Sequence, residues 1–147
     1  MSPARERPAV LDTGVLVHYA RRSPTYQAIE EQFGPLTAKP EYHILSTVVE
    51  GEALALANYQ NWGQPKLSRL REMLGQLVRV NAGQRFVVDA YVGLYAVARS
   101  SGQAIGQNDL WIAATALATG ADLYTCDDDF CFLSPQHLLV HYVPETA

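Results

Sequence analysis

The sequence predicts an α/β protein with a central parallel sheet and helices on both faces of that sheet. Short apolar runs, typical of buried strands, alternate along the chain with longer segments that repeat at helical spacing. Consecutive parallel strands need a crossover connection, and a helix between each pair supplies one. The 147 residues, 48% of them hydrophobic, suffice for one core. We therefore expect a single domain over residues 1–147, with its core at about 9–143.

The first strand and the first helix meet at an aspartate. A short apolar run at Ala9–Leu11 is expected to form the strand, and it ends at Asp12. Val15, Leu16 and Tyr19 then recur at the spacing of one helix face.

The next segments repeat this alternation. A short helix is expected at Tyr26–Phe33 and a strand at His43–Ser46. Thr47 and Glu50 fit the capping box that begins many helices, in which a hydroxyl and a carboxylate accept hydrogen bonds from backbone N–H groups. The apolar residues that follow continue this helix to about Gln60.

The second half of the chain alternates in the same way. Its clearest signal is a stripe of apolar residues from Val87 to Ala98 at helical spacing. Its most apolar helix closes with Gly120, as a helix with a glycine cap does. The expected elements, in order, are a helix at Lys66–Gln76, a strand at Leu77–Val80, a long helix ending near Ser101, a buried helix at Asn108–Thr119, and strands at Leu123–Thr125 and Leu138–Val143.

The composition excludes several classes of protein. The 11 Lys and Arg residues against 15 Asp and Glu residues give a net charge of −4, which rules out a globally basic nucleic-acid binder but not a local basic patch. No apolar run approaches the roughly 18 residues of a membrane span, and the first residues do not resemble a secretory signal. Cys126 and Cys131 are too few for a disulfide scaffold. We expect a cytoplasmic protein that does not associate with membranes.

Four acidic residues follow expected strands or begin the helices after them. Asp12 follows the first strand, Glu50 lies in the helix after the second, Asp109 begins the buried helix, and Asp127 follows the strand that ends at Thr125. Ligands of parallel sheets bind at the carboxyl ends of the strands, and these side chains can meet there.

Each acid alone also suits a structural role. Asp12 could cap its helix, Glu50 could complete the capping box, Asp109 could meet the helix dipole behind an Asn108 cap, and Asp127 could form an Asx turn. Four caps do not need to gather at one edge, where their mutual repulsion is costly unless a cation neutralises it. Mg²⁺ prefers such oxygen ligands, so the four acids together favour a metal site.

The segments around these acids resemble the signature segments of PIN-domain ribonucleases, in particular VapC-type toxins. The segments are Ala9–Leu16, Ser46–Glu50, Gly106–Ala114 and Leu123–Phe130, and the similarity spans about residues 9–143. The resemblance implies strand order 3-2-1-4-5, a Mg²⁺ or Mn²⁺ site, and endonucleolytic cleavage of structured RNA. It also implies a homodimer and an antitoxin partner that inserts a segment into the active-site groove.

The acids match the family's site residue by residue. Asp12 and Asp109 match its principal metal ligands, and Glu50 and Asp127 match its remaining acids. We therefore expect Asp12, Asp109 and Asp127 to coordinate metal, and Glu50 to hold or deprotonate the attacking water. Asp129 could share or replace the role of Asp127.

Further residues match neighbours of the family's acids. Thr13 and Thr125 stand where the family often has a hydroxyl, and Asn108 where it often has a polar cap. Cys126 stands where a basic residue is common. Glu52 adds another carboxylate to the helix after the second strand.

Cations that could hold RNA phosphates lie elsewhere in the sequence. Arg21 and Arg22 follow the first helix, and Lys66 and Arg69 lie three residues apart on one helix face. Ordinary solvated surface charge is the alternative for each. Trp62, in a turn, could stack on a base or anchor the core or a partner.

Other functions fit the sequence less well. Aspartic proteases share the Asp-Thr-Gly of residues 12–14 but are all-β. A phosphoacceptor receiver domain resembles a family that needs a lysine after its last strands, and none follows Lys66. The spacings of a zinc site drawn from Cys126, Cys131, His137 and His141 do not suit a zinc finger. The remaining alternatives to a toxin are a housekeeping RNA-processing nuclease and a catalytically inactive PIN-like module that binds RNA or protein.

Overall fold

The most apolar strands lie at the centre of a five-stranded sheet. The structure, a computed structural model, describes residues 7–146. All strand pairs are parallel, and their order is β3-β2-β1-β4-β5, which confirms the predicted α/β class and strand order. Every residue of β1 is buried, whereas the edge strands β3 and β5 are partly exposed. The strands are β1 (Ala9–Leu11), β2 (His43–Ser46), β3 (Val78–Val80), β4 (Asp122–Thr125) and β5 (Val140–Tyr142).

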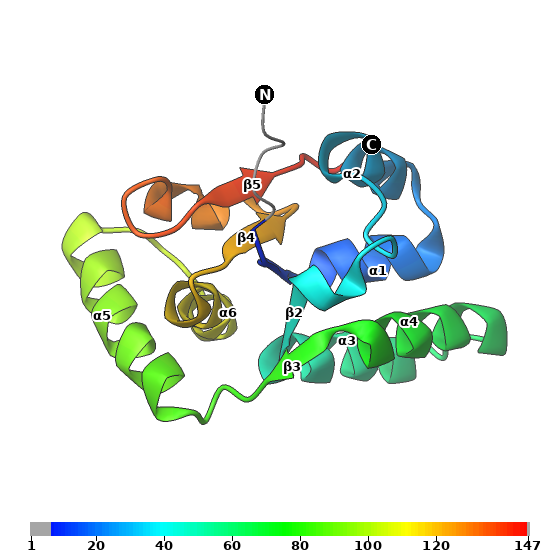
Figure 1. The fold of residues 1–147 in the computed structure, drawn as a ribbon, viewed down its shortest axis with the longest axis horizontal. Helices are drawn as coiled ribbons and strands as arrows, with labels where there is room; N and C mark the ends of the chain where they lie inside the picture. Colours follow the sequence, from blue (N-terminus) through cyan, green and yellow to red (C-terminus); the bar gives the residue numbers. More distant parts are fainter. Residues whose placement is uncertain (1–6, 147) are drawn as a thin grey trace.

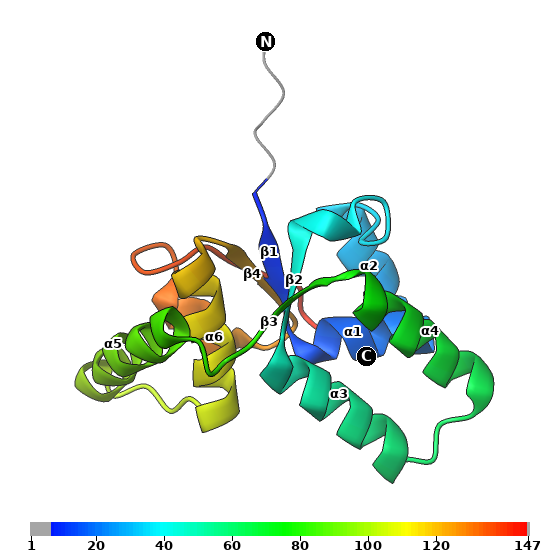
Figure 2. The same cartoon turned by 60° about the horizontal axis from the view of Figure 1, so that its bottom comes forward.

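Helices cover both faces of the sheet. Figure 1 shows the strands between α5 and α6 on one side and the remaining helices on the other, and Figure 2 shows the same separation after rotation. None of the helices in the described part of the chain is long and apolar enough to cross a membrane. The helices are α1 (Thr13–Arg21), α2 (Pro24–Phe33), α3 (Thr47–Tyr59), α4 (Gln64–Gln76), α5 (Arg85–Ser101) and α6 (Gln107–Thr119), with 3₁₀ turns η1 (Pro40–Tyr42) and η2 (Asp128–Leu133).

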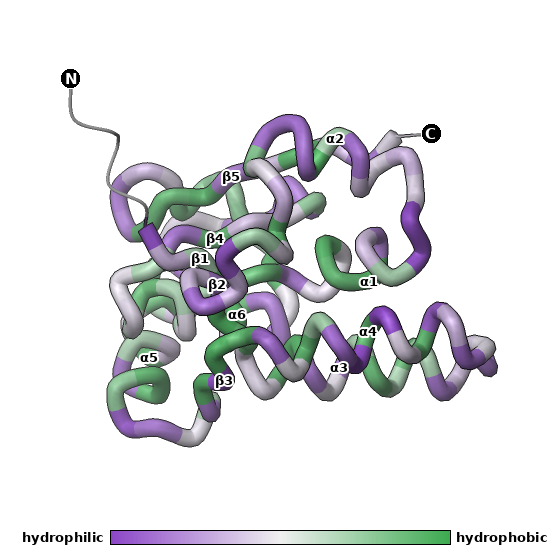
Figure 3. Tube along the Cα trace, turned by 45° about the vertical axis from the view of Figure 1, so that its right-hand side comes forward, coloured by the Kyte–Doolittle hydropathy of each residue, from purple (hydrophilic) through white to green (hydrophobic). Residues whose placement is uncertain are grey.

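Small side chains let α6 pack closely on the sheet and on α5. Ala113, Ala114 and Ala116 are fully buried together with Ile112, and α6 contacts both β1 and β4. By comparison, α4 alternates between hydrophobic and hydrophilic residues along its length in Figure 3. The first turn of α6, which carries Asp109, is thereby fixed beside the carboxyl ends of the central strands.

The start of α3 differs from the prediction. Ser46 rather than Thr47 is the N-cap, and its hydroxyl accepts a hydrogen bond from the N–H of Val48 at 3.1 Å. The Thr47 hydroxyl instead accepts the N–H of Ala82 at 3.1 Å, which ties the start of α3 to the end of β3. The predicted capping box of Thr47 and Glu50 is therefore wrong.

Candidate metal centre

Acidic side chains from four segments line one open cleft at the carboxyl edge of the sheet. Asp12 follows β1, Glu52 lies in α3, Asp109 lies in the first turn of α6, and Asp127 follows β4. The cleft has a volume of about 380 Å³. Asp12, Asp109 and Asp127 are thus brought together as the sequence indicated, although they are far apart along the chain.

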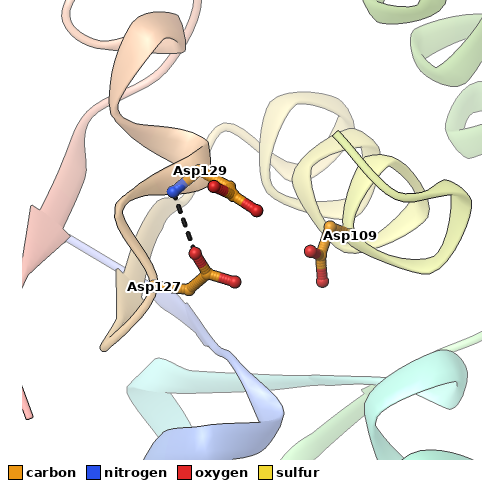
Figure 4. Close-up of side chains that lie close together, drawn as sticks. All are labelled: Asp109, Asp127 and Asp129. Atoms are coloured by element: carbon orange, nitrogen blue, oxygen red, sulfur yellow. Dashed lines mark hydrogen bonds between the residues drawn. The ribbon is translucent and has the colours of Figure 1, made fainter. Parts of the chain in front are cut away.

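Three of the aspartates are close enough to share one cation. Asp109, Asp127 and Asp129 each place a carboxylate oxygen within 4.8 Å of the other two (Figure 4). Asp127 forms an Asx turn, in which its Oδ1 accepts the N–H of Asp129 at 2.9 Å. This turn directs both carboxylates toward α6, so Asp129 joins Asp127 in the cluster rather than replacing it.

Asp12 is buried, with 7% of its surface exposed, whereas Asp109 and Asp127 are half-buried. Its Oδ1 accepts the N–H of Thr13 at 2.8 Å, and its Oδ2 accepts the hydroxyl of Thr125 at 2.7 Å. The same hydroxyl accepts the N–H of Asp127 at 2.9 Å, so Thr125 connects the two acids. Burial raises the pKa of Asp12 to about 6, although its hydrogen bonds to Thr125 and Thr13 act in the opposite direction.

Asp109 is held in an unfavourable electrostatic environment. Burial, together with the negative charges of Asp12, Asp127, Glu52 and Asp129, raises its pKa to about 7. A divalent cation among these oxygens would remove this repulsion. The donor set, made of hard carboxylate oxygens, therefore fits Mg²⁺ or Mn²⁺.

Glu50 does not reach the cleft. Its Oε1 lies 2.9 Å from the Nε of Arg79 on β3, and the two side chains form an ion pair at the far side of α3. Glu52 occupies the cleft instead: its Oε1 accepts the hydroxyl of Thr13 at 2.7 Å, and its Oε2 accepts the amide of Asn108 at 3.2 Å. The structure thus corrects the placement of the α3 acid from Glu50 to Glu52, and it gives Thr13 and Asn108 a defined contact.

The rim of the cleft contains residues that the sequence analysis did not connect with the site. Tyr142 and Glu145 line it from β5 and from the segment that follows. The Nε2 of His18 lies 3.3 Å from Glu145, and the N–H of Thr146 donates to the hydroxyl of Thr25 at 2.8 Å. No sequence pattern marks Glu145, because its position depends on these contacts with α1 and α2.

Cys126 also lines the cleft, where its surroundings disfavour the nucleophilic thiolate. Burial, together with the charges of Glu145 and Asp12, raises the pKa of its thiol to about 12, so the thiol stays protonated at neutral pH. Within residues 7–146, the cysteines and histidines of the alternative zinc site form no metal-binding group. His141, for example, bonds to Asp122 at 2.8 Å.

The raised pKa values predict that metal binding depends on pH. Protons compete with metal for Asp12 and Asp109 up to pH values near 6 and 7, so the apparent Mg²⁺ affinity should increase as the pH rises from about 5 to about 8. The stability of the metal-free protein should fall as the pH rises from about 4 to about 7, because folding raises these pKa values from the ordinary 3.8 to about 6 and about 7. Calorimetric titration with Mg²⁺ and thermal melting across these pH ranges measure both trends. An affinity that does not vary with pH would contradict the assignment.

Comparison with known proteins identifies the family. The PIN domain family model matches residues 9–133, so the chain belongs to the PIN-domain family. No curated protein sequence matches it significantly.

Solved structures share the fold at low sequence identity. A chain of VapBC2 from Rickettsia felis, bound to a DNA fragment from its promoter, superposes with a TM-score of 0.73 at 22% identity over 91% of this chain and 97% of that chain. VapBC-5 from Mycobacterium tuberculosis gives a TM-score of 0.67 at 21% identity, over 95% of this chain and 100% of that chain. VapC20 from M. tuberculosis, described as a Sarcin-Ricin loop cleaving toxin, gives a TM-score of 0.63 at 16% identity, over 86% of this chain and 95% of that chain.

Proposed function

We propose that this PIN domain is a metal-dependent endoribonuclease that acts as the toxin of a toxin–antitoxin pair. The observation that carries the proposal is the convergence of Asp109, Asp127 and Asp129 within 4.8 Å, beside the buried carboxylate of Asp12. Such a concentration of negative charge weakens the fold unless a cation occupies it. A cluster of this kind is therefore better explained by chemistry than by helix capping.

The aspartates would hold Mg²⁺ or Mn²⁺. When bound, the cation supplies Lewis acidity that activates water and stabilises negative charge on phosphoryl oxygens. Thr125 keeps Asp12 in place through its hydroxyl, and the Asx turn keeps Asp127 and Asp129 on the same side of the cleft. Asp109 completes the set from α6.

Glu52 is the side chain best placed to act as a general base. Thr13 and Asn108 each donate a hydrogen bond to one of its carboxylate oxygens, which fixes the orientation of the group in the cleft. A carboxylate held in this way can accept a proton from a water that attacks the phosphodiester. The role that the sequence analysis gave to Glu50 is therefore proposed for Glu52.

The names of the structural neighbours support the biological context. Two of them belong to VapBC toxin–antitoxin systems, and VapC20 is described as a toxin that cleaves the Sarcin-Ricin loop. On these names we propose structured RNA as the substrate and an antitoxin protein as the partner. A homodimer as the assembly and the cytoplasm as the location are proposed from the family resemblance alone.

Metal removal tests the proposed function directly. RNA cleavage should require Mg²⁺ or Mn²⁺ and should stop in EDTA, because a carboxylate such as Glu52 can accept a proton but cannot supply the Lewis acidity that neutralises charge on the phosphoryl oxygens. Recovery of cleavage on adding back the metal is the control for irreversible damage. Undiminished cleavage in EDTA would overturn the mechanism, and an absence of RNA cleavage in both metals would favour an inactive binding module.

Metal binding should also stabilise the fold. For a dissociation constant of about 1 mM, about 10 mM Mg²⁺ contributes roughly 1.4 kcal/mol, or a few degrees in melting temperature. Asp12→Asn should lose most of this increase, yet it should melt at or above the metal-free wild type because one repelling charge is gone. Thermal scans at matched ionic strength compare the two proteins. Equal responses to Mg²⁺ would mean that Asp12 is not a ligand.

A further inference from the structure

A second polar feature lies at the other end of α1. Asp12 caps the start of this helix in the acidic cleft, and Arg21 is the last of its nine residues, about 13 Å further along the axis. There, Arg21 meets the connection between α3 and α4, which carries Trp62. This connection projects at the right of Figure 2, on the opposite side of the molecule from α5.

Trp62 holds two cations at one place. The Cζ of Arg21 lies 5.4 Å from the centroid of the Trp62 ring, and the Nζ of Lys66, from α4, lies 5.0 Å from it. The side-chain oxygen of Gln60 accepts hydrogen bonds from Arg21 and from the indole N–H of Trp62. Arg69 adds a third cation where α4 packs on α1, because its Nε donates to the carbonyl of Ala20 at 2.9 Å. We call Arg21, Trp62, Lys66 and Arg69 the Trp62 patch.

The cations of the Trp62 patch are not neutralised. Within residues 7–146, Arg21, Lys66 and Arg69 form no ion pair with a carboxylate, whereas Arg7 and Arg79 each have an acidic partner. Cations gathered without a counter-charge repel one another, and contact with the π face of Trp62 offsets only part of this cost. The arrangement therefore favours a negatively charged ligand.

A nuclease with this acidic cleft needs a phosphate-binding site elsewhere on the protein. Among residues 7–146, no lysine or arginine lines the cleft, so these acids repel a phosphate backbone. We propose that the Trp62 patch binds phosphates of the RNA strand whose scissile phosphate lies at the acids. Helix α1 then spans the distance between the phosphate-binding patch and the cleavage site. This inference rests on the proposed nuclease function and adds the path of the substrate. Cations combined with an aromatic ring are the usual means of holding single-stranded nucleic acid.

Binding measurements test the patch separately from catalysis. The probe is a fluorescein-labelled single-stranded oligoribonucleotide, titrated in Ca²⁺, with fluorescence anisotropy recorded at several KCl concentrations. Arg21→Gln/Lys66→Gln should weaken binding on the order of tenfold and reduce the slope of log Kd against log[KCl] by about 1.4, since each lost phosphate contact removes about 0.7. Lys66→Gln alone, which leaves the end of α1 unchanged, should show about half of the change in slope.

Arg99→Gln is the matched control. Like Arg21, Arg99 lies in the last turn of a helix and contacts an aromatic ring, with its Cζ 5.9 Å from the centroid of Tyr95, but it lies on α5. This variant should bind RNA like the wild type. If the double variant and Arg99→Gln bind RNA with equal affinity and equal salt dependence, the proposal is overturned.

Cleavage of a long RNA and of a dinucleotide distinguishes a loss of RNA binding from a loss of catalysis. The double variant should raise KM for a long RNA without lowering kcat, and it should cleave a dinucleotide like the wild type, because the single phosphate of a dinucleotide leaves none for the patch. Loss of antitoxin binding or of dimerisation with intact RNA binding would assign the patch to a protein partner and overturn the proposal. A wild type that cleaves no RNA, combined with patch variants that bind RNA more weakly, would refute the nuclease function but keep the patch as an RNA site.

Discussion

Asp109→Asn is expected to lower RNA cleavage by on the order of 10³-fold, or about 4 kcal/mol in activation free energy. The substitution preserves the shape of the side chain but removes a charged oxygen ligand from the group formed with Asp127 and Asp129. The fold should survive, because the pKa of Asp109 is raised by burial and by its acidic neighbours, so the loss of its charge relieves repulsion. Initial rates on RNA, with circular dichroism melting of the metal-free protein, measure the two effects.

A matched substitution on α5 controls for the change of charge. Asp89 is exposed and outside the cleft, so Asp89→Asn should retain wild-type cleavage. If Asp109→Asn also keeps wild-type turnover, Asp109 is only a residue of the first helical turn, and the metal assignment fails.

Glu52→Gln and Glu50→Gln should have opposite consequences. Glu52→Gln should lower kcat by roughly 10²–10³-fold, since an amide held by Thr13 and Asn108 cannot accept a proton. Glu50→Gln should leave kcat close to the wild-type value. It breaks only the partly exposed ion pair with Arg79, which costs about 0.2–1 kcal/mol of stability. Steady-state kinetics of both variants, with melting curves, decide between the two acids. The reverse pattern would return the role to Glu50.

The geometry of a helix explains why only one of these two acids reaches the cleft. Successive residues of an α-helix are rotated by about 100°, so Glu50 and Glu52 point about 200° apart around α3. One faces Arg79 on β3, and the other faces Thr13 and Asn108. The sequence contains both carboxylates but does not show which side of α3 turns toward α6, because that depends on tertiary packing.

The elements defined by apolar patterns were predicted more closely than those defined by polar contacts. The strand at His43–Ser46 has its predicted bounds, and the buried helix starts one residue before the predicted Asn108. The η2 turn at Asp128–Leu133 was not predicted, because it depends on the hydrogen bond from the N–H of Asp129 to Asp127 and on the burial of Phe130. Patterns of burial repeat along a sequence, whereas single hydrogen bonds between side chain and backbone leave no such repeat.

The alanines of α6 make the site sensitive to genetic change at a distance from the acids. Ala113, Ala114 and Ala116 have no exposed surface, and α6 packs on α5 and α3 as well as on β1 and β4, so a valine at any of them would push the helix away from a neighbouring element. Asp109 would move with its helix, and a metal site tolerates little displacement of its ligands. Alleles that abolish activity therefore extend beyond the codons for the carboxylates to a row of alanine codons, each of which a single base change converts to valine.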